Sequence, residues 1–242
     1  MRYMIVHKTN AHWESDARPT KELIERVGRM VGELVQTRQL LGADGLRPSS
    51  KGVRVRFEGG QRTVTPGPFK SNGDVAGFAI LKVGSIEEAV ERVAPFAALV
   101  GDVELDIRPV TEAWDLGMSE KPAGLTTQRV MSTHRLLDPA AGTTPPSPEL
   151  MQSMGSLIQE MSASGTLLST EGFPPTSAWT RLRSVNGKQT VIDGPFAESK
   201  ELIGGFIIIG VSSKDEALGW LRRYATDVGA EEVDLIPLPD YQ

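Results

Sequence analysis

The sequence contains no cysteine and only three histidines among its 242 residues, namely His7, His12 and His134. The absence of thiols excludes disulfide bonds, thiol nucleophiles and thiolate metal sites. The histidines lack the i,i+4 or HxH spacing that preorganises metal ligands, so we expect no metal site. No apolar run approaches the ~20 residues of a membrane-spanning helix, and the segment MRYMIVHKTN lacks the long apolar region of a signal peptide. We therefore expect no membrane association and a cytoplasmic location.

The sequence also lacks an excess of positive charge and the common nucleotide-binding motifs. The formal net charge is -5 at pH 7, so no overall field attracts nucleic acid. The chain contains no GxxxxGK[ST] motif, no GxGxxG motif between a strand and a helix, and no GxSxG motif. We therefore expect no nucleic-acid partner and no cofactor. With 39% hydrophobic and 24% charged residues, the composition is typical of a globular domain.

A Gly-Pro-Phe turn occurs twice, at residues 67–69 and 194–196, at a spacing of 127 residues. The same offset relates His7 to His134 and many other pairs of similar residues, and it becomes 128 after the turn. A period this long, seen twice, indicates two duplicated units rather than a solenoid. We expect a first repeat at 1–116, a linker at 117–125 and a second repeat at 126–242.

Each repeat shows the same order of local patterns. A leading strand precedes an amphipathic helix, which in the first repeat runs to about Leu41. A hairpin, an apolar strand, a helix with an S-x-x-E capping box and a final alternating strand follow. Thr20 and Ser147 are suited to cap the first helices, and Ser85 and Ser213 the second ones. The order β-α-β-β-β-α-β predicts an α+β fold, with helices on one face of a mainly antiparallel, ferredoxin-like sheet.

The segment VIDGPFAESKE, residues 191–201, concentrates charge around the second Gly-Pro turn. Its carboxylates offer a general base tuned by a neighbouring lysine, and its glycine permits backbone to approach a ligand. The candidate site residues of this segment are Asp193, Gly194, Glu198, Lys200 and Glu201. The alternative is a tight turn in which the aspartate caps its own backbone and the other charges pair on the surface.

Two histidines and two arginines complete the candidate site. His7 and His134 end the two leading strands and are candidate acid–base partners of Asp193; alternatively, they point into solvent or a hydrogen bond. Arg56 and Arg183 lie at equivalent places on the hairpin strands. Facing a pocket, they would bind an anionic substrate; facing water, they would protect a sheet edge from aggregation.

The string DGPFAESKE, followed by GGF and preceded by a hairpin strand and a leading strand near MRYM, resembles the YCII-related family in its DGPF subgroup. The resemblance covers nearly the whole chain, once per repeat. It implies a dimeric α+β barrel with a pocket between sheet and loops. Here the fused repeats would form a pseudo-dimer within one chain, which leaves room for further homo-oligomerisation. Members of the subgroup are often associated with extracytoplasmic-function sigma factors.

Two functions fit these patterns. The first is a cofactor-free lyase or isomerase acting on a small polar or anionic substrate, with Asp193 as proton acceptor, His134 or His7 as its partner and Arg183 as anion clamp. The second is a non-catalytic ligand-binding or regulatory module, in line with the sigma-factor association. Convergent titratable groups in the pocket would favour the enzyme.

Overall fold

The computed structural model describes residues 1–71, 73–138, 146–196 and 202–240. The first half of the chain contains β1 (Arg2–Lys8), α1 (Ala11–Glu14), α2 (Lys21–Gln36), β2 (Leu40–Gly45), β3 (Val53–Glu58), β4 (Gln61–Pro66), β5 (Gly77–Val83), α3 (Ile86–Val100) and β6 (Val103–Pro109). The second half contains β7 (Gln128–Leu136), α4 (Pro148–Ala163), β8 (Leu167–Gly172), β9 (Thr180–Val185), β10 (Lys188–Asp193), β11 (Ile203–Gly210), α5 (Lys214–Val228) and β12 (Glu232–Leu238). Short 3-10 turns at Ser49–Lys51 and Thr176–Ala178 precede the hairpins. Helices and antiparallel strands together confirm the predicted α+β class.

Two strands were not predicted. β2 and β8 follow the first helix of each half, where the sequence indicated helix as far as about Leu41. The helix α2 instead ends at Gln36, and Arg38 adopts a positive φ of 60° that breaks the helical path. Leu40 then pairs with Ile209 of β11. These strands are short, partly exposed and paired on one side within the described residues, so they carry little apolar alternation of their own.

The predicted helix caps are confirmed. The hydroxyls of Thr20 and Ser147 accept hydrogen bonds from the third residue after each, at 3.3 and 3.2 Å. Ser85 and Ser213 accept from Glu88 N at 3.1 Å and from Glu216 N at 3.2 Å. These bonds satisfy backbone donors that have no partner inside the helix. Among the described residues, no helix has the length and apolarity needed to cross a membrane.

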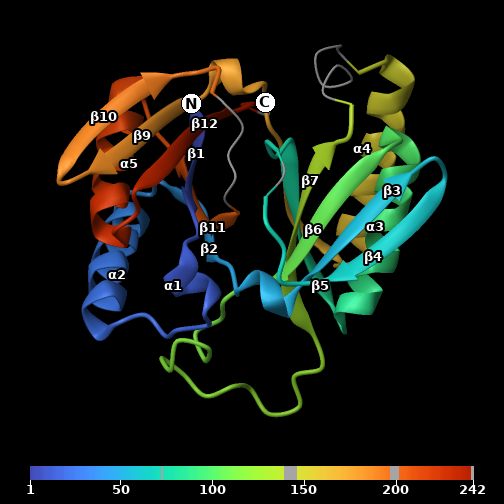
Figure 1. Ribbon diagram of the computed structural model, residues 1–242, viewed down its shortest axis with the longest axis horizontal. Coiled ribbons are helices and arrows are strands. Elements are labelled where there is room, and N and C mark those ends of the chain that lie inside the picture. Colours follow the sequence, from blue (N-terminus) through green and yellow to red (C-terminus); the bar gives the residue numbers. More distant parts are fainter. Residues whose placement is uncertain (72, 139–145, 197–201, 241–242) are drawn as a thin grey trace.

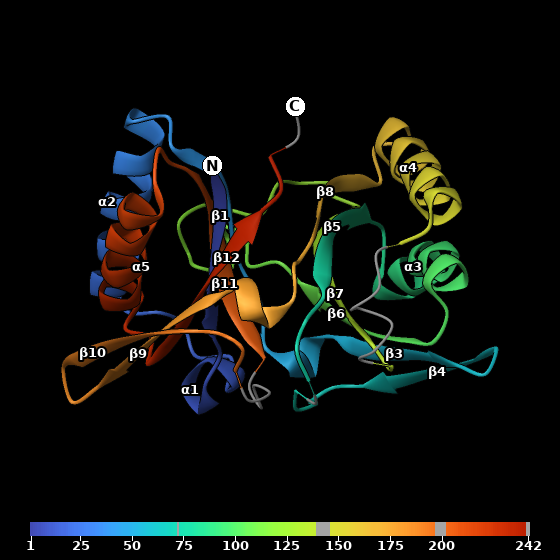
Figure 2. The same cartoon turned by 90° about the horizontal axis from the view of Figure 1, so that it is seen from above.

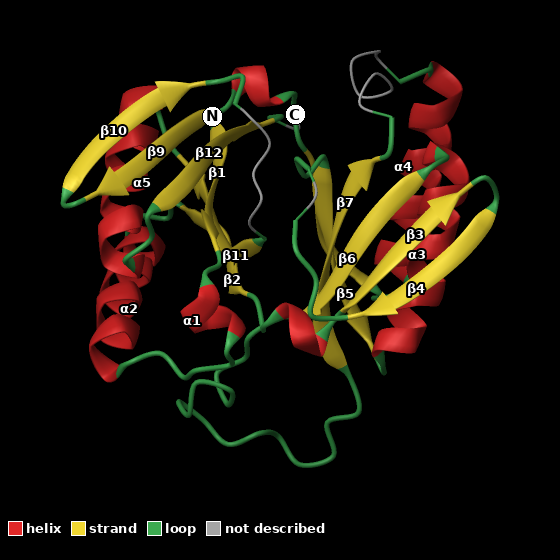
Figure 3. Ribbon diagram, viewed as in Figure 1, coloured by secondary structure: helices red, strands yellow, loops and turns green. Residues whose placement is uncertain are grey.

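The strands form two antiparallel six-stranded sheets. The first sheet has the order β10-β9-β12-β1-β11-β2, and the second has the order β4-β3-β6-β7-β5-β8. Helices α2 and α5 cover the outer face of the first sheet, and α3 and α4 cover the outer face of the second (Figures 1, 2 and 3). The inner faces of the two sheets pack against each other, and the rings of Phe78 and Phe206 meet across the gap with centroids 5.3 Å apart.

Each sheet draws strands from both halves of the chain. The first sheet joins β1 and β2 to β9–β12, and the second joins β7 and β8 to β3–β6. The exchange is equal on both sides, because β7 and β8 are the counterparts of β1 and β2 in the repeated order. Residues 53–172 therefore supply the whole second sheet, whereas the first sheet uses both ends of the chain. The predicted repeats, 1–116 and 126–242, remain intervals of the sequence and do not each enclose one sheet.

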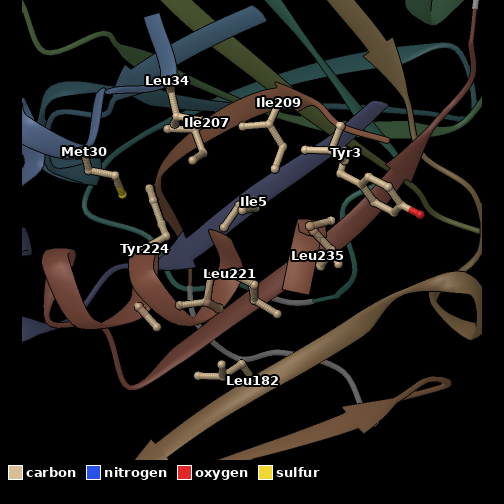
Figure 4. Packing of buried hydrophobic residues seen from close by; sticks show 14 residues of the cluster. Tyr3, Ile5, Met30, Leu34, Leu182, Ile207, Ile209, Leu221, Tyr224 and Leu235 are labelled. Carbon is tan, nitrogen blue, oxygen red and sulfur yellow. The ribbon is translucent and has the colours of Figure 1, made fainter. Parts of the chain in front are cut away.

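Alternation along the strands separates the cores. Tyr3 and Ile5 of β1 face the helices, together with Leu221 and Tyr224 of α5 (Figure 4). Met4 of the same strand faces the other sheet, in a cluster that includes Phe78 and Phe206. A third cluster lies between the second sheet and α3. Because successive side chains of a strand point to opposite faces, the central strands contribute to two cores at once.

Candidate functional site

Charged side chains interrupt the apolar inner faces of both sheets. In β12, Val233 and Leu235 pack on the helix side, so Asp234 between them faces the second sheet. In β6, Leu105 and Ile107 pack on the helix side in the same way, and Asp106 faces the first sheet. The two aspartates occupy equivalent positions 128 residues apart.

The Asp234 cluster consists of Lys8, Arg181, Glu232 and Asp234. Asp234 is fully buried. It accepts hydrogen bonds from Arg181 Nε at 2.6 Å and Nη2 at 3.0 Å, and Lys8 Nζ lies 2.9 Å from its Oδ2. Burial acts to raise the pKa of Asp234, but the positive charges of Lys8 and Arg181 outweigh it and hold that pKa below its ordinary value. Glu232 pairs with Arg181 at 3.2 Å.

The Asp106 cluster repeats this arrangement with Arg54, Glu104, Asp106 and Arg135. Arg54 donates to Asp106 from Nε at 2.7 Å and from Nη2 at 3.0 Å. Arg135, the counterpart of Lys8, donates to Oδ2 of Asp106 from Nη1 at 3.0 Å and from Nη2 at 2.9 Å. Glu104 lies 3.2 Å from both arginines. Each sheet thus buries one aspartate between two cations.

The Gly-Pro-Phe turns cover these clusters. Phe196 stacks on the guanidinium of Arg181 at 4.3 Å, and Phe69 stacks on that of Arg54 at 4.7 Å. A Cβ on Gly194 would lie 1.9 Å from the carbonyl oxygen of Thr176, and the same close approach occurs at Gly67. Gly194 is therefore required by backbone packing against a 3-10 turn. It does not line the pocket between the sheets.

A pocket opens between the sheets beside both clusters. Its empty space is about 560 Å³ when open solvent at its mouth is included, but its cavity volume is only about 20 Å³, which is room for about one water molecule. Its charged lining residues are Lys8, Asp74, Asp106, Arg108, Arg135 and Asp234, and its large apolar ones are Val6, Leu46, Val75, Met131, Phe173, Trp179, Leu202, Ile203 and Ile236. We call this space the inter-sheet pocket. Both halves of the chain supply its walls.

Arg108 breaks the symmetry of the inter-sheet pocket, because its counterpart 128 residues later is Ile236. Arg108 is 3% exposed and donates to Ile203 O at 2.5 Å and to Arg47 O at 2.6 Å. It also donates to Glu14 at 3.2 Å. Burial lowers the pKa of Arg108 from its ordinary value, against the pull of Glu14. Its guanidinium ties the second sheet to the start of β11.

Asp193, the predicted proton acceptor, lies at the exposed end of β10. Its carboxylate accepts from Thr180 Oγ1 at 2.7 Å and from Lys214 Nζ at 3.2 Å. It is on the helix side of the sheet, the side of Val191, and its side chain is 72% exposed. The hydrogen bond from Thr180, followed by that from Lys214, lowers its pKa. Such a carboxylate stays ionised and is a weak base.

His7 and His134 also face the helices and not the inter-sheet pocket. His7 Nδ1 lies 2.8 Å from the hydroxyl of Tyr224 on α5. The ring of His134 packs on Phe96 of α3, with centroids 4.7 Å apart. Burial, followed by nearby cations, lowers the pKa of each histidine to about 4. The predicted pair of Asp193 with a histidine does not form. The alternation of side chains along a strand shows which residues share a face, but not which residues of different strands come close together.

The lowered pKa values of the half-buried His7 and His134 predict that the protein loses stability at acid pH. In the unfolded chain each histidine has a pKa near 6.5, whereas in the folded chain its pKa is about 4. Between these two pH values the unfolded chain therefore binds more protons than the folded chain. The free energy of unfolding should therefore fall as pH drops from 6.5 to 4, by on the order of 2 kcal/mol per histidine. Urea titrations of a His7→Gln, His134→Gln variant should show a flatter dependence in this window. The exposed His12→Gln serves as control; equal slopes in both variants would contradict the assignment.

The remaining predicted residues lie at the rim or beyond the described chain. Arg183, 55% exposed, pairs with Glu232 at 3.0 Å. Arg56, 42% exposed, pairs with Glu58 at 3.0 Å. Both are on the inner side of their sheets, but neither lines the inter-sheet pocket. The three other predicted residues, Glu198, Lys200 and Glu201, lie outside the described residues.

The charged residues that line the pocket were not predicted from the sequence. A signal was present: Lys8 and Arg135 are cations at equivalent positions, and Asp106 and Asp234 are aspartates inside the otherwise apolar strings LDI and VDLI. A charge kept twice within a buried strand indicates a paired ion. Among the described residues, no group of three histidine, aspartate or glutamate side chains is placed to hold a metal ion.

Comparison with known proteins shows that the second half of the chain resembles a known domain family. Residues 131–238 match the YCII-related domain. A stretch of 73 residues, 30% of this chain, is 37% identical to an uncharacterised protein of Rhizobium meliloti (strain 1021). That stretch spans 59% of the length of this relative. The matched residues contribute strands to both sheets. The resemblance predicted from the sequence is therefore confirmed for residues 131–238, which correspond to a YCII-related domain.

Proposed function

We propose that the chain is a non-catalytic module that binds a small molecule in the inter-sheet pocket. One observation carries this proposal: each sheet places a buried aspartate beside a largely buried cation at equivalent positions, and all four side chains line the same pocket. Buried charges are costly to desolvate, and replacing them by apolar residues is often neutral or stabilising. Their presence at a pocket, on faces that are otherwise apolar, is explained most simply by a polar ligand.

Binding is favoured over acid–base catalysis by the state of the two aspartates. Asp106 accepts four hydrogen bonds from Arg54 and Arg135. Asp234 is in contact with three donor atoms of Arg181 and Lys8. Carboxylates bonded in this way have little capacity left to take a proton from a substrate. The lyase or isomerase hypothesis, built on Asp193 and a histidine, has no matching geometry among the described residues.

We also propose that the two halves arose by duplication within the DGPF subgroup and form an intramolecular counterpart of a dimeric α+β barrel. The repeated element order, the equal exchange of β1–β2 and β7–β8, and the paired clusters support this proposal. A regulatory role linked to extracytoplasmic-function sigma factors would be compatible with a binding module, in which ligand occupancy is the signal.

A substitution that fills the pocket tests the binding function. Val75 lines the pocket from a loop and is half-buried, so Val75→Trp should block the site while sparing the strands. A compound at about 100 times its Kd should raise the Tm of the wild type by about 5–10 °C. This shift should vanish in Val75→Trp and persist in Val64→Trp, which changes an exposed valine of β4.

The measurement is differential scanning fluorimetry of the full chain against a collection of small polar compounds. The function would be rejected if no compound raised the Tm of the wild type, or if the same compounds stabilised Val75→Trp as strongly as the wild type.

A further inference from the structure

The carboxylates that line the inter-sheet pocket are already engaged. Both oxygens of Asp106 accept from guanidinium groups, and so do both oxygens of Asp234. Asp74, the third carboxylate of the lining, interacts electrostatically with Arg181. A ligand that offers mainly donors would therefore compete with these ion pairs.

Hydrogen-bond donors remain available in the same pocket. Arg135 is 5% exposed, and its Nε is buried without a hydrogen-bond acceptor among the described residues. Lys8 has three N–H donors, and the one described partner of its ammonium is Asp234. These two side chains are counterparts in the repeat and line the same pocket from opposite sheets. Buried donors are nearly always paired, so the acceptor of Arg135 Nε must come from outside the described residues.

An apolar wall lies beside these donors. Phe173 and Trp179 meet edge to face with ring centroids 5.8 Å apart, and both line the pocket together with Leu46. The indole N–H of Trp179 donates to Pro174 O at 2.8 Å, so this ring offers the pocket an apolar surface and no further donor. The cavity volume of about 20 Å³ admits a group of few atoms and not a ring, so a ring would have to lie in the open mouth of the pocket.

We propose that the ligand is a small organic carboxylate. Its oxygens accept hydrogen bonds from Arg135 Nε and Lys8 Nζ in the small cavity between the sheets, and its hydrocarbon part lies against Phe173 and Trp179 in the open mouth. This inference rests on the proposed binding function and adds the class and the orientation of the ligand. Arg108, present on one side only, makes the two sides of the pocket unequal, so one ligand binds per chain.

Calorimetric titration of the full chain with matched pairs of probes tests the class. The pairs are benzoate with benzamide and butyrate with butyramide, which differ in charge and acceptor strength at nearly constant shape. We expect each carboxylate to bind at least about tenfold more tightly than its amide, with one site per chain, because hydrogen bonds to charged groups are the stronger ones. Benzoate should bind more tightly than butyrate, since it covers more of the aromatic wall.

Two variants test the orientation. Arg135→Lys keeps the positive charge but removes the Nε donor, and Lys8→Gln removes the ammonium. Each should weaken benzoate binding by at least about tenfold, whereas Lys82→Gln, at an exposed position of β5, should leave it unchanged. The comparison of benzoate with benzamide on the wild type needs no variant, so a folding defect cannot obscure it.

Equal affinity for amides and carboxylates, or unchanged benzoate binding in both variants, would overturn the inference. So would a wild type that binds none of the four probes but is stabilised by other compounds that Val75→Trp no longer binds. That last outcome would leave the binding function standing and reject only the ligand class.

Discussion

Replacing Asp234 with alanine is expected to lower the free energy of unfolding by about 3–5 kcal/mol. The change leaves Arg181 and Lys8 beside an empty, fully buried position, with two positive charges and no carboxylate between them. For a chain of this size the Tm should fall by about 10 °C. Urea denaturation followed by circular dichroism measures the loss.

A matched control and a rescue separate this effect from a general loss of packing. Asp215→Ala removes an exposed aspartate from the first turn of α5 and should cost well under about 1 kcal/mol. The triple variant Lys8→Met, Arg181→Met, Asp234→Leu removes the charges together and should recover most of the lost stability. An unchanged urea midpoint for Asp234→Ala would show that the cluster is solvated, which would also weaken the case for the pocket.

Neither half of the chain is expected to fold as a stable monomer. In fragment 1–116, the strands β1 and β2 lack β9–β12, and β3–β6 lack β7 and β8. The central strands would then expose unpaired backbone groups and apolar faces. We expect fragments 1–116 and 126–242 to be insoluble or to dimerise by exchanging their first strands, as they do within the chain. Mixed or co-expressed fragments should form a 1:1 complex.

Light scattering after size-exclusion chromatography measures these masses. The control is the full chain cut by a protease at a site introduced into 117–124, which is exposed between β6 and β7. The nicked chain should keep both pieces in one particle. A folded, monomeric fragment of either half would contradict the exchanged arrangement.

Local patterns predicted most of the elements but not two of the strands. The caps at Thr20 and Ser147, the hairpins and the apolar strands depend on interactions within a few residues, so they are legible in the sequence. β2 and β8 are edge strands whose pairing with β11 and β5 links distant residues. Such pairing depends on long-range contacts, and a partly exposed strand has no strong pattern of its own.

The candidate site shows the same difference between local patterns and long-range contacts more clearly. Asp193 and the histidines were selected because of their chemistry and their symmetry in the repeat, and the structure places them on the helix side or at an exposed edge. Asp106 and Asp234 were not predicted as site residues, because they lie within apolar strings. Alternation shows that Asp234 and His7 occupy defined faces of their strands, but not which face is covered by helices and which by the other sheet.

The sequence by itself determined the repeated order of elements except β2 and β8, their caps and turns, the α+β class, and a resemblance to the YCII-related family that the comparison supports for residues 131–238. Only the tertiary structure decided how β1–β2 and β7–β8 are exchanged between the sheets, and which charges meet in the inter-sheet pocket. The physical reason is the distance along the chain over which each kind of interaction acts. Propensity, capping and turn chemistry act between near neighbours in the chain, whereas sheet order and burial depend on contacts between residues that lie tens to more than two hundred positions apart.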